Sequence, residues 1–391
     1  LRVALLSMIV AGASGCNSVG SGGPVEDETG GVPTPTPRPP EKTYLGFTPL
    51  PPSLAPADQD LVYSRFGADA NITAHHFDVG VPWNEALIDT YPYDTHIMRD
   101  WGDRLAKTPP SHKIYVAVTP INFERNGLAP YRKNQDNMAL VAPFDALGAA
   151  SDFNNTSVRT AYLNYCRRVI RYFNPDFFAF GIEVNLVRKA STATWANYLQ
   201  LHGFIYTRLK TEFPDLPIFA SVVGVPLLYA YEGAPAEFNG TPDPAQAYMD
   251  SQRAALAQIL AHSDYYAISF YPYASIFYNT PFPANMIPTL LDLSTKPLAI
   301  AETGILAQDL SVLGFTLIGS EARQHDYFDQ LIGEMKKREG KFIINFVPQD
   351  YDQLCIDLGG CGDAIKVWMN TGFYSETGSE RSVLQMWRSN L

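Results

Sequence analysis

Basic residues are scarce in this chain and are nowhere gathered into a tract. The 391 residues include 29 Lys and Arg against 40 Asp and Glu, which gives a net charge of −11. A chain with this balance repels the phosphates of nucleic acids and the head groups of anionic membranes. The composition therefore argues against nucleic acid as a partner, and it favours neutral over acidic ligands.

Cysteine is also rare, with four residues, and no Cys/His spacing is typical of a zinc site. Cys355 and Cys361 lie close together, and in an exported chain such a pair indicates a local disulfide. Cys166 falls in an amphipathic helical pattern, which predicts a buried and inert thiol. The sequence calls for no metal and no cofactor.

The apolar run at residues 3–11 is too short to span a bilayer and fits the hydrophobic segment of an export signal. Small residues and Cys16 follow, which resembles a bacterial lipoprotein signal, although Ala13 stands where Leu is usual. We expect a signal over residues 1–16 with a lipidated Cys16, a Gly/Ser/Pro/Thr-rich linker over 17–42 and a folded domain over 43–391. The protein would then be an exported lipoprotein of the cell envelope, held to the membrane only by its lipid; the alternative is a secreted protein.

The folded part is rich in short apolar runs that alternate with amphipathic helical patterns. We expect strands at residues 44–49, 72–77, 113–120, 177–182, 217–223, 265–271, 298–301 and 342–346. Such alternation predicts a parallel sheet, and eight strand–helix units predict an α/β fold of the (β/α)8 or TIM-barrel type. Residues 121–155 form a connection too long for a simple link, so we expect a binding or lid segment there.

Two of the expected strands end in a glutamate. Glu183 follows the fourth strand and Glu302 the seventh, and in a barrel of this type both strand ends lie on the same face. Either residue alone could belong to a structural ion pair. Together, two carboxylates about 5–5.5 Å apart can hydrolyse a glycosidic bond. Tyr271, at the end of the sixth strand, is placed to hold the Glu302 carboxylate.

These strand ends resemble those of the clan A glycoside hydrolases. The fourth-strand motif of the clan is similar to residues 180–185, its sixth strand to 266–273, notably in the endo-β-1,4-galactanase family, and its seventh strand to 297–304. The resemblance implies a retaining enzyme with Glu302 as nucleophile and Glu183 as general acid/base. It also implies a poly- or oligosaccharide substrate, and we expect endo action.

One position departs from the clan. An asparagine usually precedes the acid/base and binds the sugar's 2-hydroxyl, whereas here that residue is Ile182. Other polar side chains would have to compensate, and the candidates are Asn185, Asn122, His75 and His76. Because side chains alternate along a strand, we expect one of the two histidines in the site and the other outside it.

The expected rim of the barrel carries aromatic residues that could stack on sugars. The candidates are Trp83, Tyr273, Tyr278 and Phe346. Taken singly, each is better interpreted as a packing residue, but we expect at least one of them to form a sugar subsite. Asp78 and Glu85 follow the second strand, and we interpret both as solvated surface charges.

The sequence thus favours a lipid-anchored retaining glycosidase. A non-catalytic glycan-binding lipoprotein with a hydrolase-like barrel is the alternative, and Ile182 favours it. The two facing glutamates argue against it, because neighbouring carboxylates repel each other and a protein that only binds glycans has no need for such a pair. A metal-dependent barrel hydrolase is a third possibility, for which His75 and Asp78 offer only a weak ligand pattern.

Overall fold

The computed structural model describes residues 42–230, 236–312 and 314–391. The expected signal peptide, the linker and the lipidation site Cys16 therefore lie outside the described residues. Within the described ranges, no helix combines the length and the hydropathy needed to cross a membrane.

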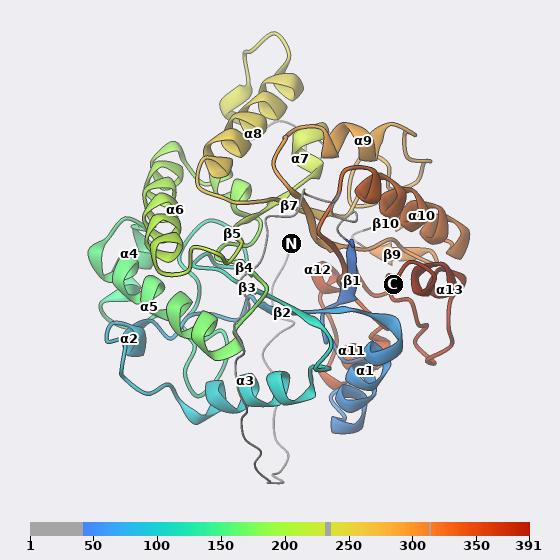
Figure 1. Ribbon diagram of the computed structural model, residues 1–391. Helices are drawn as coiled ribbons and strands as arrows, with labels where there is room; N and C mark the ends of the chain where they lie inside the picture. Colours follow the sequence, from blue (N-terminus) through green and yellow to red (C-terminus); the bar gives the residue numbers. More distant parts are fainter. Residues whose placement is uncertain (1–41, 231–235, 313) are drawn as a thin grey trace, which may run out of the picture.

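A parallel barrel forms the centre of the molecule, and Figure 1 shows the helices as an outer ring around it. The sheet runs in the order β5-β4-β3-β2-β1-β11-β8-β7-β6. Its strands are β1 Tyr44–Phe47, β2 Ile72–Phe77, β3 Lys113–Val118, β4 Phe177–Ala179, β5 Ile218–Phe219, β6 Ser221–Val223, β7 Tyr266–Phe270, β8 Leu298–Thr303 and β11 Phe342–Asn345. Because β5 and β6 are two halves of one strand interrupted at Ala220, they close the sheet into the expected eight-stranded barrel.

The main helices follow the strands of the barrel, as the alternating pattern of the sequence predicts. They are α1 Pro56–Asp69, α3 Thr95–Lys107, α5 Thr156–Phe173, α6 Thr192–Glu212, α8 Pro244–Leu260, α9 Met286–Leu291, α10 Glu321–Lys337 and α13 Ser382–Arg388. Five begin at a side chain that accepts a hydrogen bond from the first helical turn, which stabilises that end: Asp94, Asn155, Ser191, Asp243 and Ser320. The last helix packs on the first, where Trp387 Nε1 donates to the Asp69 carbonyl at 2.8 Å.

Short elements that the sequence did not predict lie in the connections between these strands and helices. They are α2 Trp83–Ala86, α4 Phe144–Ala149, η1 Val184–Lys189, α7 Val225–Leu228, η2 Ala236–Phe238, the hairpin β9 Leu310–Val312 and β10 Phe315–Leu317, α11 Asp352–Asp357 and α12 Asp363–Lys366. The predicted disulfide joins Cys355 in α11 to Cys361 in the loop that follows, with an S–S distance of 1.99 Å. Cys166 is a buried free thiol, as predicted.

Aromatic side chains fill the interior of the barrel. The ring of Tyr115 lies 4.8 Å from that of Phe342, and Phe219 stacks on Tyr265 at 5.3 Å. Phe177 also packs on Phe342, at 4.9 Å. These rings fill the barrel interior as a packed core. Polar side chains that could act on a ligand are therefore expected at the mouth, at the carboxyl ends of the strands.

Close packing of β1 against β2 depends on a glycine. A methyl group on Gly46 would lie 1.9 Å from the carbonyl oxygen of Ile72, which is far inside van der Waals contact. Gly67, within α1, faces open space, with no other heavy atom within 4 Å of the corresponding position. The two glycines therefore offer a matched pair for testing the barrel.

We expect Gly46→Ala to lower the free energy of unfolding by about 3 kcal/mol, because the added methyl forces two barrel strands apart. Gly67→Ala should instead raise it by about 0.5–1 kcal/mol, because alanine favours the helix. Urea denaturation of both variants beside the wild type measures the two effects. Equal changes for both would contradict the close contact between β1 and β2.

Candidate active site

A β-bulge turns Glu302 toward the mouth of the barrel. Ala299 and Ala301 of β8 pack in the barrel interior, so simple alternation would point the next residue outward. The pairing with β7 shifts at this point: Ile300 pairs with Ile268, but Glu302 pairs with Ser269. The extra residue in β8 restores the inward direction, and the Glu302 side chain comes to lie at the mouth.

The Glu302 carboxylate is buried and has two side-chain partners. His76 Nε2 of β2 lies 2.9 Å from Oε1, and the hydroxyl of Tyr271, just after β7, donates to Oε2 at 3.3 Å. Burial lowers the pKa of His76, but the Glu302 carboxylate and Asp78 outweigh it, so that the pKa is raised above 6.5. His76 is thus suited to be the cationic partner of Glu302.

Glu183 lies at the break between β4 and η1, in a left-handed backbone conformation with φ 54°. This conformation is unusual for a residue with a side chain and costs free energy. The Glu183 backbone N–H donates to Ser221 Oγ at 3.0 Å, and Ser269 Oγ donates to its carboxylate at 2.8 Å. Since Ser269 is also the strand partner of Glu302, the two glutamates lie on either side of one β7 residue.

A third carboxylate and an arginine complete the cluster. Arg125, on the loop after β3, places Nη2 3.2 Å from Glu183 Oε2 and 2.8 Å from Asp78 Oδ2. The Arg125 and Asp78 side chains are only 4% and 7% exposed. The sequence predicted a binding segment over residues 121–155 but gave no sign of Arg125, because nothing in its local pattern distinguishes it from a surface residue.

The interpretation of Asp78 and Glu85 as solvated surface charges is wrong. Asp78 is buried against Arg125, and Glu85 accepts hydrogen bonds from the hydroxyl of Tyr131 at 2.7 and 2.9 Å. The reason is the loop after β3, which folds back on the segment after β2. Val81 N–H donates to the Pro130 carbonyl at 2.9 Å, and the long loop thereby covers both acids.

Of the two histidines, His75 points away from the site. Its Nε2 lies 3.0 Å from Thr108 Oγ1, and its ring packs on Phe173 at 5.3 Å, between the sheet and the helices. Burial lowers the pKa of His75 to about 3, so the ring is neutral. Its assignment as a substrate-binding residue is therefore wrong, whereas His76 contacts Glu302.

The two candidate asparagines serve the loops. Asn122 Oδ1 accepts hydrogen bonds from the backbone N–H groups of Asn126 and Gly127, at 2.9 and 3.0 Å, and so shapes the turn that carries Arg125. Asn185 is fully buried and exchanges hydrogen bonds with the backbone of Val223. Asn185 Nδ2 also donates to Gln252 Oε1, so this fully buried residue is structural and its assignment to substrate binding is wrong. Asn122 is half-buried and lines a cavity, and its role in substrate binding stays a prediction.

Of the candidate stacking residues, Phe346 packs on His76, the partner of Glu302. Trp83 is fully buried and stacks on Phe144 at 5.2 Å, and the buried Tyr273 donates its hydroxyl to the Val367 carbonyl. Both are packing residues, which corrects the expectation of sugar platforms there. Phe346 is half-buried, with its ring 5.3 Å from that of His76.

A further half-buried aromatic, Trp368, was not predicted from the sequence. Its ring lies 5.9 Å from Tyr271 and 6.2 Å from Phe346, so it borders the site beside Glu302. Trp368 belongs to the connection after β11 and follows α12, far in sequence from every motif. Ile182, in turn, is fully buried with the apolar residues of the barrel interior.

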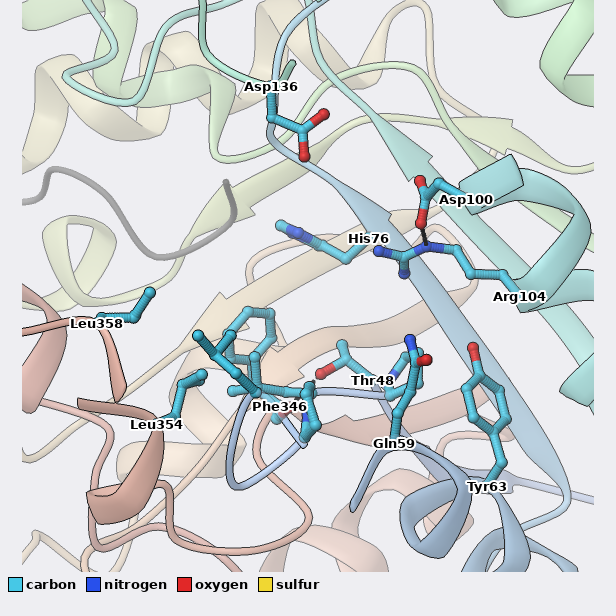
Figure 2. A pocket seen from close by; sticks show the side chains of 14 residues that line it. Thr48, Gln59, Tyr63, His76, Asp100, Arg104, Asp136, Phe346, Leu354 and Leu358 are labelled. Carbon is cyan, nitrogen blue, oxygen red and sulfur yellow. Dashed lines mark hydrogen bonds and ion pairs between the residues drawn. The ribbon is translucent and has the colours of Figure 1, made fainter. Parts of the chain in front are cut away.

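A cavity of about 70 Å³ opens beside His76 and Phe346. Figure 2 shows Arg104, Gln59 and Tyr63 at one end, and Leu354 and Leu358 at the other. The lining thus offers hydrogen-bonding groups at one end and apolar contact at the other. Neither Glu302 nor Glu183 lines this cavity, which borders the site only through His76 and Phe346.

The two glutamates have different surroundings, as acid and nucleophile roles require. Glu302 faces a histidine and a tyrosine hydroxyl, whereas Glu183 faces a serine hydroxyl and a guanidinium that it shares with Asp78. A pair of carboxylates in unlike environments can divide acid/base and nucleophilic work between them.

No protein-family model matches the chain, and no curated protein matches it in sequence. Solved glycosidase structures do match its fold. The exo-β-1,4-mannosidase Op5Man5 from Opitutaceae bacterium strain TAV5 superposes with a TM-score of 0.55 at 11% identity, over 89% of this chain and 59% of that one. The GH5_18 structure from Streptomyces cattleya, in complex with GlcNAc, gives 0.55 at 10% identity, over 90% and 80% of the two chains.

The β-glycosidase BGL167 gives a TM-score of 0.52 at 10% identity, over 85% of this chain and 86% of that one. The chain spans about three fifths of the mannosidase chain and most of the other two. The TIM-barrel fold, predicted from the eight strand–helix units, is thereby confirmed.

The buried His75 predicts an acid-sensitive fold. The pKa of His75 in the folded state is about 3, whereas its ordinary value is 6.5. Its contribution to the free energy of unfolding is therefore complete above pH 6.5 and is lost as the pH falls toward 3. Between pH 7.5 and 5 this loss amounts to about 2 kcal/mol. His75→Phe should remove this pH-dependent loss. Over the same interval, the free energy of unfolding of the variant should fall by about 2 kcal/mol less than that of the wild type.

Urea denaturation at pH 7.5, 6.5 and 5 measures the difference. His325→Phe is the control, since His325 lies on the exposed side of α10 and should keep the wild-type pH dependence. An unchanged pH dependence in His75→Phe would show that the histidine is not held neutral by its surroundings.

Proposed function

We propose that this protein is a retaining glycoside hydrolase with Glu302 as nucleophile and Glu183 as general acid/base. The observation that carries the proposal is the pair of buried glutamates, 6% and 2% exposed, on opposite sides of Ser269 at the mouth of the barrel. Double displacement at an anomeric carbon uses two carboxylates that face each other. The shared fold with glycosidases supports the same class of reaction.

In the first step, a carboxylate oxygen of Glu302 attacks the anomeric carbon while the bond to the leaving oxygen breaks. Glu183 gives its proton to that oxygen, and a covalent glycosyl ester forms on Glu302. His76 and Tyr271 hold the attacking carboxylate in place through their hydrogen bonds to its two oxygens.

In the second step, Glu183 accepts a proton from a water molecule, whose oxygen attacks the same carbon. The ester bond to Glu302 breaks, and the sugar leaves with its original anomeric configuration. Glu183 ends the cycle protonated and Glu302 ends it as a carboxylate, so the protons balance over the two steps.

The substrate proposed is a neutral oligo- or polysaccharide. Support comes from the acidic net charge of the chain, from the half-buried rings of Phe346 and Trp368 beside Glu302, and from the cavity next to His76. Endo action is proposed from the resemblance of residues 266–273 to the galactanase sixth strand.

A glycan-binding protein without catalysis is the second candidate. Two observations favour it: Ile182 offers no hydrogen bond at the position before Glu183, and Arg125 lies against the Glu183 carboxylate. The experiment below separates the two functions.

Reducing-sugar release from a panel of neutral and acidic polysaccharides tests the proposal directly. We expect the wild type to act on a neutral glycan, and we expect Glu302→Ala to reduce release to background. Glu183→Ala should lose about 10²–10⁴-fold, the usual contribution of a positioned acid/base. Glu85→Gln, at a buried glutamate outside the site, should keep wild-type activity and serves as the control.

A second measurement identifies the nucleophile. An activated 2-deoxy-2-fluoro glycoside should add one glycosyl mass to the wild type and none to Glu302→Ala, as intact mass spectrometry would show. If the wild type releases no sugar from any glycan yet Glu302→Ala still binds one in affinity electrophoresis, the protein is a glycan-binding module and the enzymatic proposal is overturned.

A further inference from the structure

One guanidinium group serves two carboxylates at the mouth of the barrel. Arg125 Nη2 lies 2.8 Å from Asp78 Oδ2 and 3.2 Å from Glu183 Oε2, and all three side chains are buried. Arg125 is fixed by its own loop: its backbone N–H donates to the Asn122 carbonyl at 2.9 Å, and it has a left-handed φ of 57°. The conformation of this loop therefore fixes the backbone position from which the Arg125 side chain reaches both acids.

The charges around Glu183 do not cancel. Three carboxylates meet here, from the segment after β2, the end of β4 and β8, and they face two cationic groups, Arg125 and His76. The hydroxyl groups of Ser221, Ser269 and Tyr271 also form hydrogen bonds with the two glutamates. With every acid ionised, the buried cluster carries a net charge of −1, and uptake of one proton would neutralise it. Burial and like-charge repulsion both favour that proton.

The three carboxylates differ in their cationic partners. His76 Nε2 lies 2.9 Å from Glu302 Oε1. Asp78 and Glu183 share Arg125, and Asp78 is the nearer of the two. The other oxygen of Glu183 accepts a hydrogen bond from the Ser269 hydroxyl. The proton affinity of Glu183 therefore depends on both Arg125 and Asp78.

We propose that Asp78 and Arg125 are positioning residues that set the proton affinity of Glu183. Asp78 draws the charge of Arg125 toward itself, which leaves Glu183 able to hold the proton it must give to the leaving group. Arg125 keeps that affinity low enough for Glu183 to lose the proton again. Neither residue needs to touch the reacting atoms. The inference rests on the proposed function of Glu183 and adds the device that controls it.

Two single substitutions should have opposite effects. Asp78→Asn removes the competing carboxylate, so the full charge of Arg125 falls on Glu183 and favours its ionised form. The basic limb of the kcat/KM–pH profile should then move down by about one pH unit. Arg125→Gln removes the cation and leaves the acids to repel each other, so the basic limb should move up by about one pH unit or more.

The control is Arg132→Gln. Arg132 is equally buried on the same loop and is paired with Asp100 and Asp136, but it makes no contact with Glu183 among the described residues. The variant should lose stability in urea denaturation, as Arg125→Gln does, and should keep the wild-type basic limb. If Arg125 only held the loop in place, its substitution would shift neither limb of the kcat/KM–pH profile, because loss of structure lowers activity at every pH.

Carbon-13 NMR of glutamate side-chain carboxyls gives a readout without turnover. The Glu183 signal is identified by its absence in Glu183→Gln, and its titration should shift down in Asp78→Asn and up in Arg125→Gln. If the wild type proves inactive on every glycan, the proposed function fails, and this titration still decides the coupling. Should Arg125→Gln fail to fold, Asp78→Asn decides alone.

The inference is overturned if both variants move the Glu183 titration in the same direction or leave it unchanged. It is also overturned if Arg132→Gln shifts the basic limb as far as Arg125→Gln does, since the effect would then belong to the loop and not to the shared guanidinium.

Discussion

The structure of the mouth depends on the need to compensate three buried carboxylates. An unpaired charge in a protein interior costs several kcal/mol, so each acid must have a hydrogen-bonded or cationic partner close by. His76 from β2 and Tyr271 after β7 serve Glu302, while Arg125 from the loop after β3 serves both Asp78 and Glu183. Five separate segments of the barrel therefore have to meet within a few ångströms.

Several irregular features of the backbone follow from that requirement. The bulge in β8 turns Glu302 inward, and the left-handed conformations at Glu183 and Arg125 aim their side chains at each other. Each is a local cost that only a rigid frame can sustain. The aromatic core beneath them, with Tyr115 and Phe342 at its centre, supplies the frame and leaves room for polar groups only above it.

The parts of the structure with a regular hydrophobic pattern could be predicted from the sequence. The eight strand–helix units, both glutamates at the strand ends and the nearby Tyr271 follow from apolar runs and from barrel geometry. The sequence could not tell which of His75 and His76 points inward, because that depends on register. The bulge before Glu302 has no local signature. Arg125 and Trp368 come from loops whose paths are set by tertiary contacts, and the same contacts bury Asn185 and Trp83.

The composition of the cluster bears on the choice between catalysis and binding. A site that only holds a neutral sugar needs hydroxyls, amides and aromatic faces, and Asn or Gln would supply these without the charge. Replacing a buried ion pair by apolar groups is often neutral or stabilising by about 1–4 kcal/mol, so a binding protein would gain by losing Asp78, Arg125 and Glu183 together. Ile182 shows that the end of strand four can be apolar. Three acids and two cations beside it are consistent with the proposed reaction, in which Glu183 gives and takes a proton.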